Sequence, residues 1–413
     1  MRNLILSMCV IATLNATALT VTSTPGELHN IITGDLSAVT ELTITGEMDA
    51  RDFRFIADSL NQITDVDLSA TRITAFTNTS VPTLGRVFQF AADELPTLSF
   101  MCKPIKHIAL PVTLRTVGEA AFTGCTALEV IDWSTTLDSI APYAFAGCEA
   151  LTEITLPSAL TALGHNAFAY CTSLTSVKVG DEAKLSHVGE CAFVDCCLLN
   201  EVNLGDNISE IGEGAFANTA ISTLDLSNLN NLKVVNGWIA SGSPVEAVVL
   251  PATVTTIAEG ALLGTKDIAQ LTLPATVGYI GDLAMAGMTG LTELTAEPET
   301  VPELGEQVWF GVNQPGVTLR VPPLAKIDYQ EALQWQEFNI VSNLLKGDIN
   351  LDGAINVADV NVILNIILNE GTDDEDLFSR ADVNEDSKVN VGDVNSVLNI
   401  ILQQRVRRRA SHR

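Results

Sequence analysis

The residues best suited to chemistry lie near the C-terminal end, where the chain repeats one pattern of Asp and Asn. The first copy runs from Asp348 to Asp359 and the second from Asp382 to Asp393. Oxygen-bearing side chains fall at the first, third, fifth, ninth and twelfth places of both copies, and the seventh residue can offer its backbone carbonyl. Ca²⁺ is a hard cation that takes about six to eight oxygen ligands at such a spacing. The pattern therefore predicts two bound Ca²⁺ ions.

This spacing is that of an EF-hand-type loop. The predicted ligands, with Ala354 and Lys388 acting through their carbonyls, are Asp348, Asn350, Asp352, Ala354, Asn356, Asp359, Asp382, Asn384, Asp386, Lys388, Asn390 and Asp393. The sixth place requires a positive φ, which Gly353 supplies and Ser387 does not easily adopt. We therefore expect the second loop to bind more weakly. An acidic surface run is the alternative interpretation, but each loop leads into a matching apolar helix, Val360–Leu368 or Val394–Leu402.

The stretch from Lys346 to Leu402 resembles a type I dockerin, a calcium-stabilised module that docks onto cohesin domains of a scaffold protein. The resemblance implies that the tenth and eleventh loop residues and the following helix contact the cohesin. The residues that match these positions are Val357, Ala358, Leu364, Asn365, Val391, Gly392, Leu398 and Asn399. Many dockerins carry Ser-Thr at the tenth and eleventh places, whereas this chain does not, which implies a more apolar contact. The alternative is that the two helices pack only on each other.

A second pattern governs the middle of the chain. From Ile105 onward, units of the form L-x-x-I-x-L recur about every 23 residues, and each is followed by a G-x-x-A-F-like segment. The apolar anchors of these segments are Phe122, Phe145, Phe168, Phe193, Phe216, Ile239, Leu262 and Met285. One unit cannot bury its own apolar face, so stacked units are expected. The sequence predicts an α/β solenoid, a leucine-rich repeat array with a parallel sheet, joined to a small all-α calcium-binding domain.

The L-P, I-G-x-x-A-F and G-C elements of these units resemble BspA-like bacterial leucine-rich repeats. The resemblance extends to a closing cap at Val317–Phe338. The predicted divisions are a signal peptide (1–18), an N-terminal cap with a first repeat and an insertion (19–104), repeats (105–300), a C-terminal cap (301–343), the dockerin-like module (344–403) and a basic tail (404–413). We expect the tail to be a disordered, solvated end.

Four cysteines, Cys125, Cys148, Cys171 and Cys196, fall in the same place of successive units. A column of reduced, buried thiols is the favoured interpretation, since free Cys packs as a small hydrophobe. Disulfides or a zinc site are the alternatives, including one bridge among the cluster Cys191, Cys196 and Cys197.

Charge and the N-terminal stretch bear on location. The formal net charge is −28, which argues against nucleic-acid binding and against adsorption to anionic lipid. Arg2, the apolar run Leu4–Leu14 and the small residues Ala16-Thr17-Ala18 predict a signal peptide cleaved before Leu19. A lipid anchor at Cys9 is a less favoured alternative. We therefore expect a secreted or cell-surface protein without a membrane span.

No catalytic arrangement is visible, because the five histidines are scattered and no nucleophile or phosphate-binding motif occurs. The sequence predicts a non-enzymatic binding protein whose array recognises a protein or surface ligand and whose calcium module docks onto a cohesin-type scaffold. One alternative is an accessory component of a polysaccharide-degrading, cellulosome-like assembly, with the array binding polysaccharide or a hydrolase. Another is a calcium module that serves as an intramolecular cap without a partner.

Overall fold

A computed structural model describes residues 18–78, 88–342, 346–352, 354–369, 371–372 and 374–410. The chain divides into two compact units, one formed by residues 1–291 with 303–312 and the other by residues 292–302 with 313–413. The predicted signal peptide and its cleavage site lie almost wholly outside the described residues, as do Cys9 and Gly353.

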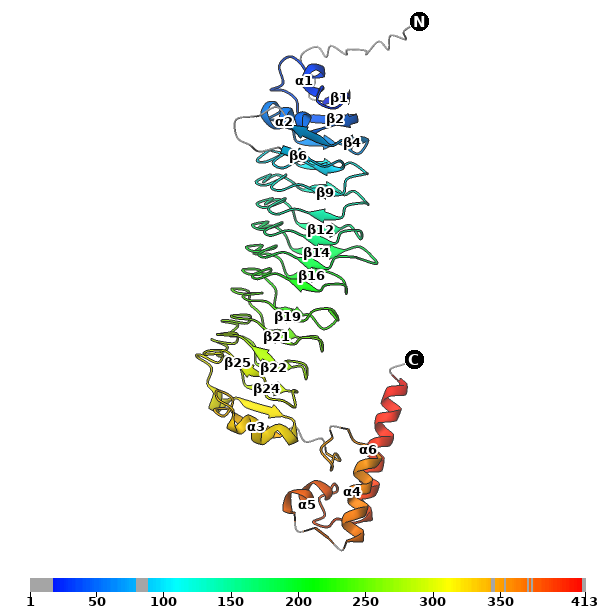
Figure 1. The fold of residues 1–413 in the computed structure, drawn as a ribbon, viewed down its shortest axis with the longest axis vertical. Coiled ribbons are helices and arrows are strands. Elements are labelled where there is room, and N and C mark those ends of the chain that lie inside the picture. Colours follow the sequence, from blue (N-terminus) through cyan, green and yellow to red (C-terminus); the bar gives the residue numbers. More distant parts are fainter. Residues whose placement is uncertain are drawn as a thin grey trace. The chain divides into compact units, whose positions relative to one another are not determined.

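The first unit is a solenoid in which consecutive parallel strands stack one above another (Figure 1). The strands predicted from the L-x-x-I-x-L segments form the first sheet face. Three strands precede them: β1 (Ala18–Ser23), β2 (Glu41–Met48) and β3 (Asp65–Asp67). The predicted strands themselves are β8 (His107–Ala109), β10 (Val130–Asp132), β12 (Glu153–Leu156), β14 (Ser176–Val179), β16 (Glu201–Asn203), β18 (Thr223–Asp225), β20 (Ala247–Val249) and β22 (Gln270–Leu273). The parallel solenoid predicted from the repeat period is thus confirmed.

Each unit also contributes a second, two-residue strand, which the sequence did not predict. These strands are β7 (Glu94–Leu95), β9 (Thr116–Val117), β11 (Ser139–Ile140), β13 (Ala162–Leu163), β15 (His187–Val188), β17 (Glu210–Ile211), β19 (Val234–Val235), β21 (Thr256–Ile257), β23 (Tyr279–Ile280) and β25 (Glu303–Leu304). Residues 105–291 form only strands and turns, so this part of the array is a β-solenoid. Two residues are too few for a period-two pattern to stand out in the sequence.

A column of stacked aromatic rings fills the core behind these strands. Its members, the phenylalanine column, are Phe100, Phe122, Phe145, Phe168, Phe193 and Phe216. Neighbouring ring centroids are 5.0–5.8 Å apart and the planes lie within 10° of parallel. Phe100 and β7 show that repeat-like packing begins before Ile105. This start was not recognised in the sequence, because the predicted insertion interrupts the repeat pattern there. Part of the insertion forms an antiparallel pair of β5 (Phe76–Asn78) and β6 (Phe88–Phe90).

The phenylalanine column is interrupted in one unit, where the sequence analysis named the wrong residue as the anchor. Phe193 N donates to Ala215 O, and Phe216 N donates to Ile239 O, both at 2.9 Å. Ile239 therefore occupies the place of the Ala in A-F, and Ala240 occupies the place of the Phe. The prediction that Ile239 is the anchor was wrong by one residue, because this unit is one residue longer before its turn.

The repeated cysteines form the second column that the sequence predicted. Cys125, Cys148, Cys171 and Cys196 are buried, and each Sγ donates to the carbonyl of a Phe of the preceding unit at 3.0–3.3 Å. Burial raises the pKa of the Cys125 thiol to about 12. All the described cysteines, including the cluster at 191–197, are free thiols.

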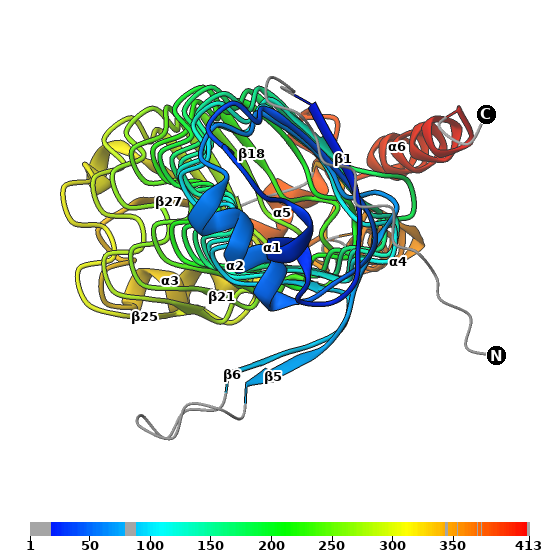
Figure 2. The same cartoon turned by 90° about the horizontal axis from the view of Figure 1, so that it is seen from above.

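The N-terminal end is covered by α1 (Leu28–Ile31) and α2 (Ala50–Ser59), while the β5–β6 pair projects from the side (Figure 2). A buried carboxylate ties the two helices together. Asp52 accepts hydrogen bonds from Gly26 N at 2.7 Å and Leu28 N at 2.9 Å. Another strand, β4 (Thr71–Ile73), pairs with β2.

The second unit begins with the strands and short helices around the predicted closing cap. Strands β24 (Glu293–Ala296), β26 (Thr318–Val321) and β27 (Asn339–Ser342) pair in parallel. The short helices η1 (Gln314–Gly316), η2 (Pro323–Ala325) and α3 (Lys326–Glu331) connect them. Tyr329 and Trp335 are buried edge to face at 5.2 Å, and their polar atoms donate to the carbonyls of Pro298 and Pro302. Aromatic rings with satisfied polar tips thus form the core of the cap.

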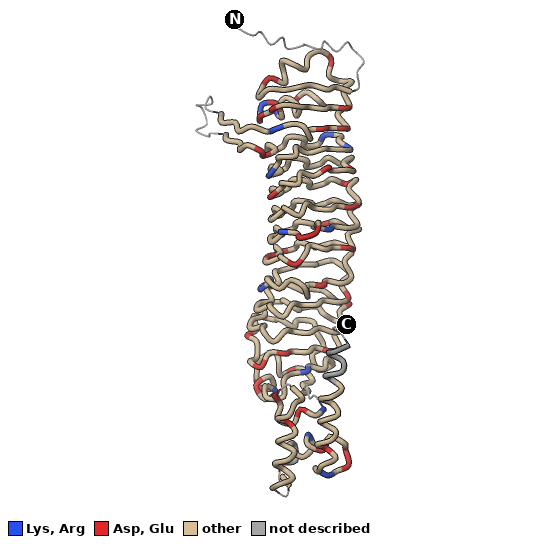
Figure 3. Tube along the Cα trace, turned by 90° about the vertical axis from the view of Figure 1, so that its right-hand side faces the viewer, with Lys and Arg blue, Asp and Glu red and all other residues tan. Residues whose placement is uncertain are grey.

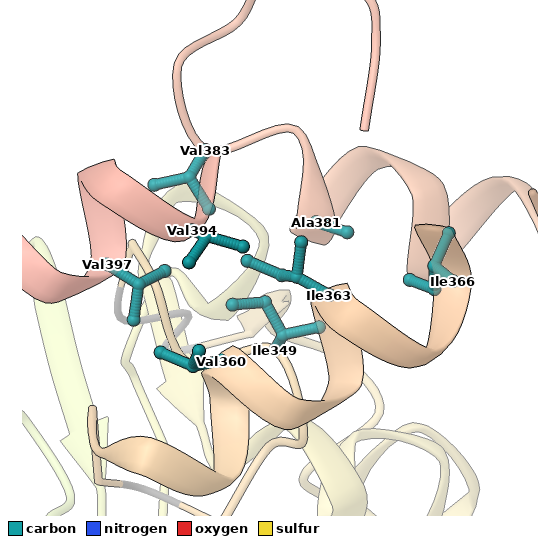
Figure 4. Close-up of a cluster of buried hydrophobic side chains, with 8 residues drawn as sticks. All are labelled: Ile349, Val360, Ile363, Ile366, Ala381, Val383, Val394 and Val397. Atoms are coloured by element: carbon teal, nitrogen blue, oxygen red, sulfur yellow. The ribbon is translucent and has the colours of Figure 1, made fainter. Parts of the chain in front are cut away.

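The calcium-loop region contains α4 (Val357–Leu368), α5 (Glu375–Ala381) and α6 (Val391–Ala410). Helices α4 and α6 pack through Val360, Ile363, Val394 and Val397, with Ile349 from the first loop between them (Figure 4). The expectation of a disordered tail from residue 404 was wrong as far as Ala410, because α6 continues to that residue. Basic residues at a helix C-terminus are favoured by its dipole.

Candidate metal centre

The first loop brings together the oxygens of its early positions. Asp352 N donates to Asp348 Oδ1 at 3.2 Å and to Asn350 Oδ1 at 3.0 Å, so these two oxygens converge on one point. The side chains of Asn350 and Asp352 meet at 2.7 Å. Asp352 also accepts a hydrogen bond from Ala354 N, and these bonds, led by the one from Asn350, lower the pKa of the Asp352 carboxyl. Three predicted ligands therefore lie side by side in their anionic or oxygen-presenting form.

The second loop repeats the contacts among its first three predicted ligands. Asp386 N donates to Asp382 Oδ1 and to Asn384 Oδ1, both at 2.9 Å. Asn384 and Asn390 each place Nδ2 near Asp386 Oδ2, at 3.0 and 3.4 Å. The oxygens of both amides are also engaged, since Asn384 Oδ1 accepts from Asp386 N and Asn390 Oδ1 accepts from Gly392 N. Oxygens from three of the predicted positions, Asp382, Asn384 and Asp386, thus gather in this loop.

The twelfth loop residues, Asp359 and Asp393, differ from the other predicted ligands in their burial and hydrogen bonds. Asp359 and Asp393 are fully buried, and each carboxylate accepts backbone N–H groups. Asp359 Oδ1 accepts from Ile349 and Asn350, and Oδ2 accepts from Asn356, at 2.8–3.2 Å. This carboxylate therefore joins the start of the loop to its end, and the ligand role predicted for it remains a prediction.

The ninth and twelfth places also begin the helices. Asn356 is the N-cap of α4 and forms a capping box with Asp359. In the second loop, Asn390 Oδ1 accepts from Gly392 N at 2.7 Å, and Asp393 Oδ2 accepts from Asn390 N at 2.8 Å. The same residue types thus serve both helix capping and a cation site. The sequence analysis missed this second role, although N-x-x-D before an apolar run could have revealed it.

The positive φ predicted for the sixth place is confirmed in the second loop, where this residue is described. Ser387 has a φ of 64°, in the left-handed region that favours glycine. Ser387 N donates to Asp382 Oδ2 at 2.7 Å, which holds the turn. Weaker Ca²⁺ binding by the second loop stays a prediction.

The donor set fits a hard cation. Each loop offers carboxylate, amide and carbonyl oxygens, which are the ligands that Ca²⁺ prefers. Across the described residues, no group of three or more His, Cys, Asp and Glu side chains is assembled as a metal site. The residues that would hold a Ca²⁺ ion are the Asp and Asn side chains of each loop together with the carbonyls of Ala354 and Lys388. When bound, the ion would supply positive charge that holds the carboxylates together.

The residues predicted to contact a partner lie mostly on the surface. The exposed fractions are equal in pairs, with Val357 at 62% and Val391 at 61%, and Leu364 and Leu398 both at 39%. Asn365 and Asn399 are exposed as well, and Ala358 and Gly392 are half-buried. Helices α4 and α6 thus bury one apolar face against each other and leave a second one outward, which argues against the alternative that they pack only on each other.

Comparison with known families identifies the class of protein. The model of the BspA type leucine rich repeat region matches residues 93–222, 182–292 and 240–314, which together cover more than half of the chain. The chain belongs to this family. The model of the dockerin type I domain matches residues 346–402. Such domains are calcium binders, and their presence implies a cohesin partner. Proteins with BspA-type repeats and dockerin domains are typically extracellular or surface proteins.

Solved structures of bacterial leucine-rich repeat proteins resemble the fold. The pneumococcal vaccine antigen PcpA has 18% identity, with 78% of this chain and 83% of that chain covered and a TM-score of 0.40. A leucine-rich repeat protein from Bacteroides ovatus has 18% identity, with 66% and 98% covered and a TM-score of 0.25. The T. pallidum protein TpLRR has 22% identity, with 51% and 66% covered and a TM-score of 0.22. A search of curated proteins found no match.

Neither matched domain is a catalytic module. Within the described part of the chain, no helix is both long and apolar enough to cross a membrane.

Proposed function

We propose that this chain is a secreted, non-enzymatic binding protein. Its dockerin domain binds two Ca²⁺ ions through the twelve predicted ligands and then docks onto a cohesin domain of a scaffold. Its repeat array recognises a protein or a surface-bound ligand. The observation that carries the proposal is the duplicated apolar surface of α4 and α6, which stays exposed after the two helices have packed together. Exposed apolar surface of this kind marks an interaction site.

Docking is expected to tolerate the loss of either helix surface but not of both. Because the exposed residues occur in matched pairs, Leu364→Asp or Leu398→Asp alone leaves one intact surface. The double variant leaves none and should lose about 30-fold or more in affinity, since truncation of a hot-spot residue costs about 2 kcal/mol or more. Binding is measured by calorimetry in Ca²⁺, using a recombinant cohesin domain from a scaffold captured by the full chain.

The control is Leu333→Asp, which changes an exposed leucine of the closing cap. It should bind as the unmodified chain does. Failure to capture any cohesin-bearing protein in Ca²⁺ would remove the basis of the proposal. Equal cohesin affinities for the double variant and the unmodified chain would show that the docking surface does not include Leu364 or Leu398.

The two loops should each bind one ion. Asp348→Ala removes an almost fully buried carboxylate from the first loop, and Asp382→Ala removes its counterpart from the second. Each variant is expected to bind one Ca²⁺ fewer in a calorimetric titration, and the remaining site identifies which loop is tighter. Glu385→Ala, an exposed neighbour outside the predicted ligand set, is the control. A stoichiometry that stays at two in either variant would overturn the ligand assignment.

A further inference from the structure

The hydrogen-bond ladder of the first sheet face stops between β16 and β18. On one side of this boundary, Glu201 N donates to Thr175 O at 3.2 Å, and on the other, Ala247 N donates to Ser222 O at 3.3 Å. Both strands are fully described, and no backbone hydrogen bond joins β16 to β18 themselves; the paired strands are β12-β14-β16 and then β18-β20. The backbone bond that crosses the boundary here, from Ala220 N to Leu199 O, lies before both strands. Each strand therefore presents a backbone edge toward the other.

The second ladder stops at the same boundary. The pairing order ends at β17 and starts again at β19. Gly212 N still donates to Val188 O, but in the next unit the side-chain amide of Asn236 donates to Ile211 O at 2.7 Å in place of a backbone N–H. The units stay joined on their turn side, where Phe216 N donates to Ile239 O. The two units are thus joined on the turn side and, on the strand side, only ahead of the strands, where Ala220 N donates to Leu199 O at 2.9 Å; β16 and β18 themselves stay unpaired.

A missing ring accompanies this opening. Ala240 stands where the next phenylalanine of the column would be, so Phe216 has no aromatic neighbour on that side. Between the two units lies a cavity of about 80 Å³. Its apolar lining includes Val202, Leu204, Ile211, Phe216 and Leu224. We call it the inter-repeat cleft.

A comparable break in the first sheet, between β10 and β12, is filled by the chain itself. There Trp133 packs edge-on against Phe145, with ring centroids 5.4 Å apart, and the second ladder continues through β11 and β13. The inter-repeat cleft has no such aromatic among its lining residues, apart from Phe216 of the column itself. A third break lies between β20 and β22, where the second ladder also continues, through β21 and β23. Of these three breaks, the one between β16 and β18 alone interrupts both ladders.

The rim of the cleft is polar and acidic. Asn200, Thr223 and Asp225 line it. Hydrogen bonds from the Ser227 side chain and backbone lower the pKa of the Asp225 carboxyl, which keeps it ionised. Glu201, at the start of β16, is exposed and forms an ion pair with Lys178 at 3.2 Å. Acidic residues exceed basic ones along the array (Figure 3). A cationic ligand is favoured over an anionic one.

We propose that the inter-repeat cleft binds an extended polypeptide segment of a partner protein, with an aliphatic side chain in the cavity, backbone pairing to the edge of β16 or β18, and a Lys or Arg beside Asp225. The proposal deepens the proposed function, in which the array recognises a protein. Unpaired strand edges are the groups to which an extended peptide adds. A cavity of about 150 Å³ accepts benzene, so this smaller one suits a single aliphatic side chain.

The test uses the full chain in Ca²⁺ and fluorescent, end-blocked heptapeptides. Their central residue is Ala, Val, Leu or Phe, its two neighbours are both Lys or both Glu, and the rest are Thr. Peptides with central Val or Leu and Lys neighbours should bind in a saturable way by fluorescence anisotropy. Central Ala should bind about tenfold more weakly, since two buried methyl groups are lost. The Glu peptides should not bind.

Two variants connect binding to the cleft. Val202→Phe fills the cavity and should abolish peptide binding. Asp225→Asn should reduce the affinity for Lys peptides about two- to fivefold, the effect of a partly exposed ion pair, without changing the preference at the central residue. Asp132→Asn is the matched control, because Asp132 has the same place on β10, and its affinity should stay unchanged.

Absence of saturable binding by every peptide would overturn the proposal, and so would affinities that neither variant alters. Binding of soluble polysaccharide in place of peptide, lost in Val202→Phe, would assign the cleft to a different ligand and also overturn it. Cohesin binding is measured on the same samples. Intact docking without peptide binding would reject the cleft alone, and peptide binding without docking would reject only the dockerin part of the proposed function.

Discussion

Removal of Ca²⁺ with EGTA is expected to unfold residues 346–402 and to abolish cohesin binding, while the repeat array stays folded. The two loops hold six Asp carboxylates, of which Asp348, Asp359 and Asp393 are buried. Bringing these charges together without a cation is costly. The array depends instead on apolar packing that contains no metal ligand.

The size of this effect follows from mass action. An ion that binds only the folded module stabilises it by about 2.7 kcal/mol per site when its concentration is 100-fold above the dissociation constant. Two such sites contribute about 5.4 kcal/mol, which is comparable with the whole stability of a small domain. The loss should therefore be nearly complete.

The measurement combines circular dichroism with limited proteolysis in Ca²⁺ and in EGTA. Helical signal should fall, and cleavage should appear within residues 346–402 but not within residues 105–291. Mg²⁺ is the control cation, because its demand for near-octahedral geometry at short distances suits these loops poorly. Retention of the helical signal and of cohesin binding in EGTA would show that the module folds without the ion.

The sequence predicted the parts of the structure that depend on repetition. Doubling of the Asp and Asn pattern located both loops, and the recurring L-x-x-I-x-L and A-F segments located the strands and the phenylalanine column. Chance does not reproduce such patterns in register, so one interpretation explains many residues at once. The positive φ at the sixth loop place was likewise predictable, and Ser387 adopts it.

Departures from the repeat were not predictable in the same way. An anchor one residue late, at Ala240, looks like a normal anchor at Ile239 when only spacing is counted. The opening beside it depends on which carbonyl each N–H finds, and that is a property of the assembled stack. The capping role of Asp359 was hidden for another reason, since the same carboxylate satisfies both a helix start and a cation site.

Phe168→Ala is expected to lower the free energy of unfolding of the array by about 3–5 kcal/mol, the usual cost of emptying a buried aromatic site. Phe168 is fully buried between Phe145 and Phe193, at centroid distances of 5.2 and 5.7 Å. Each stacked pair can add about 0.5–1.5 kcal/mol beyond burial. In a linear array each unit contacts only its neighbours, so the loss falls on two interfaces at once.

Urea unfolding followed by circular dichroism measures this loss in Ca²⁺, so that the dockerin domain stays constant. Because the damaged interfaces lie in the middle of the column, the variant should unfold in two steps, with the units on either side of Phe168 losing their coupling. Phe310→Ala is the matched control, since Phe310 is 66% exposed and its truncation empties no core site. A single transition at the unmodified midpoint for Phe168→Ala would mean that the stacked rings do not couple neighbouring units, and the stability of the array would then rest on its strand ladders, which are interrupted at the inter-repeat cleft.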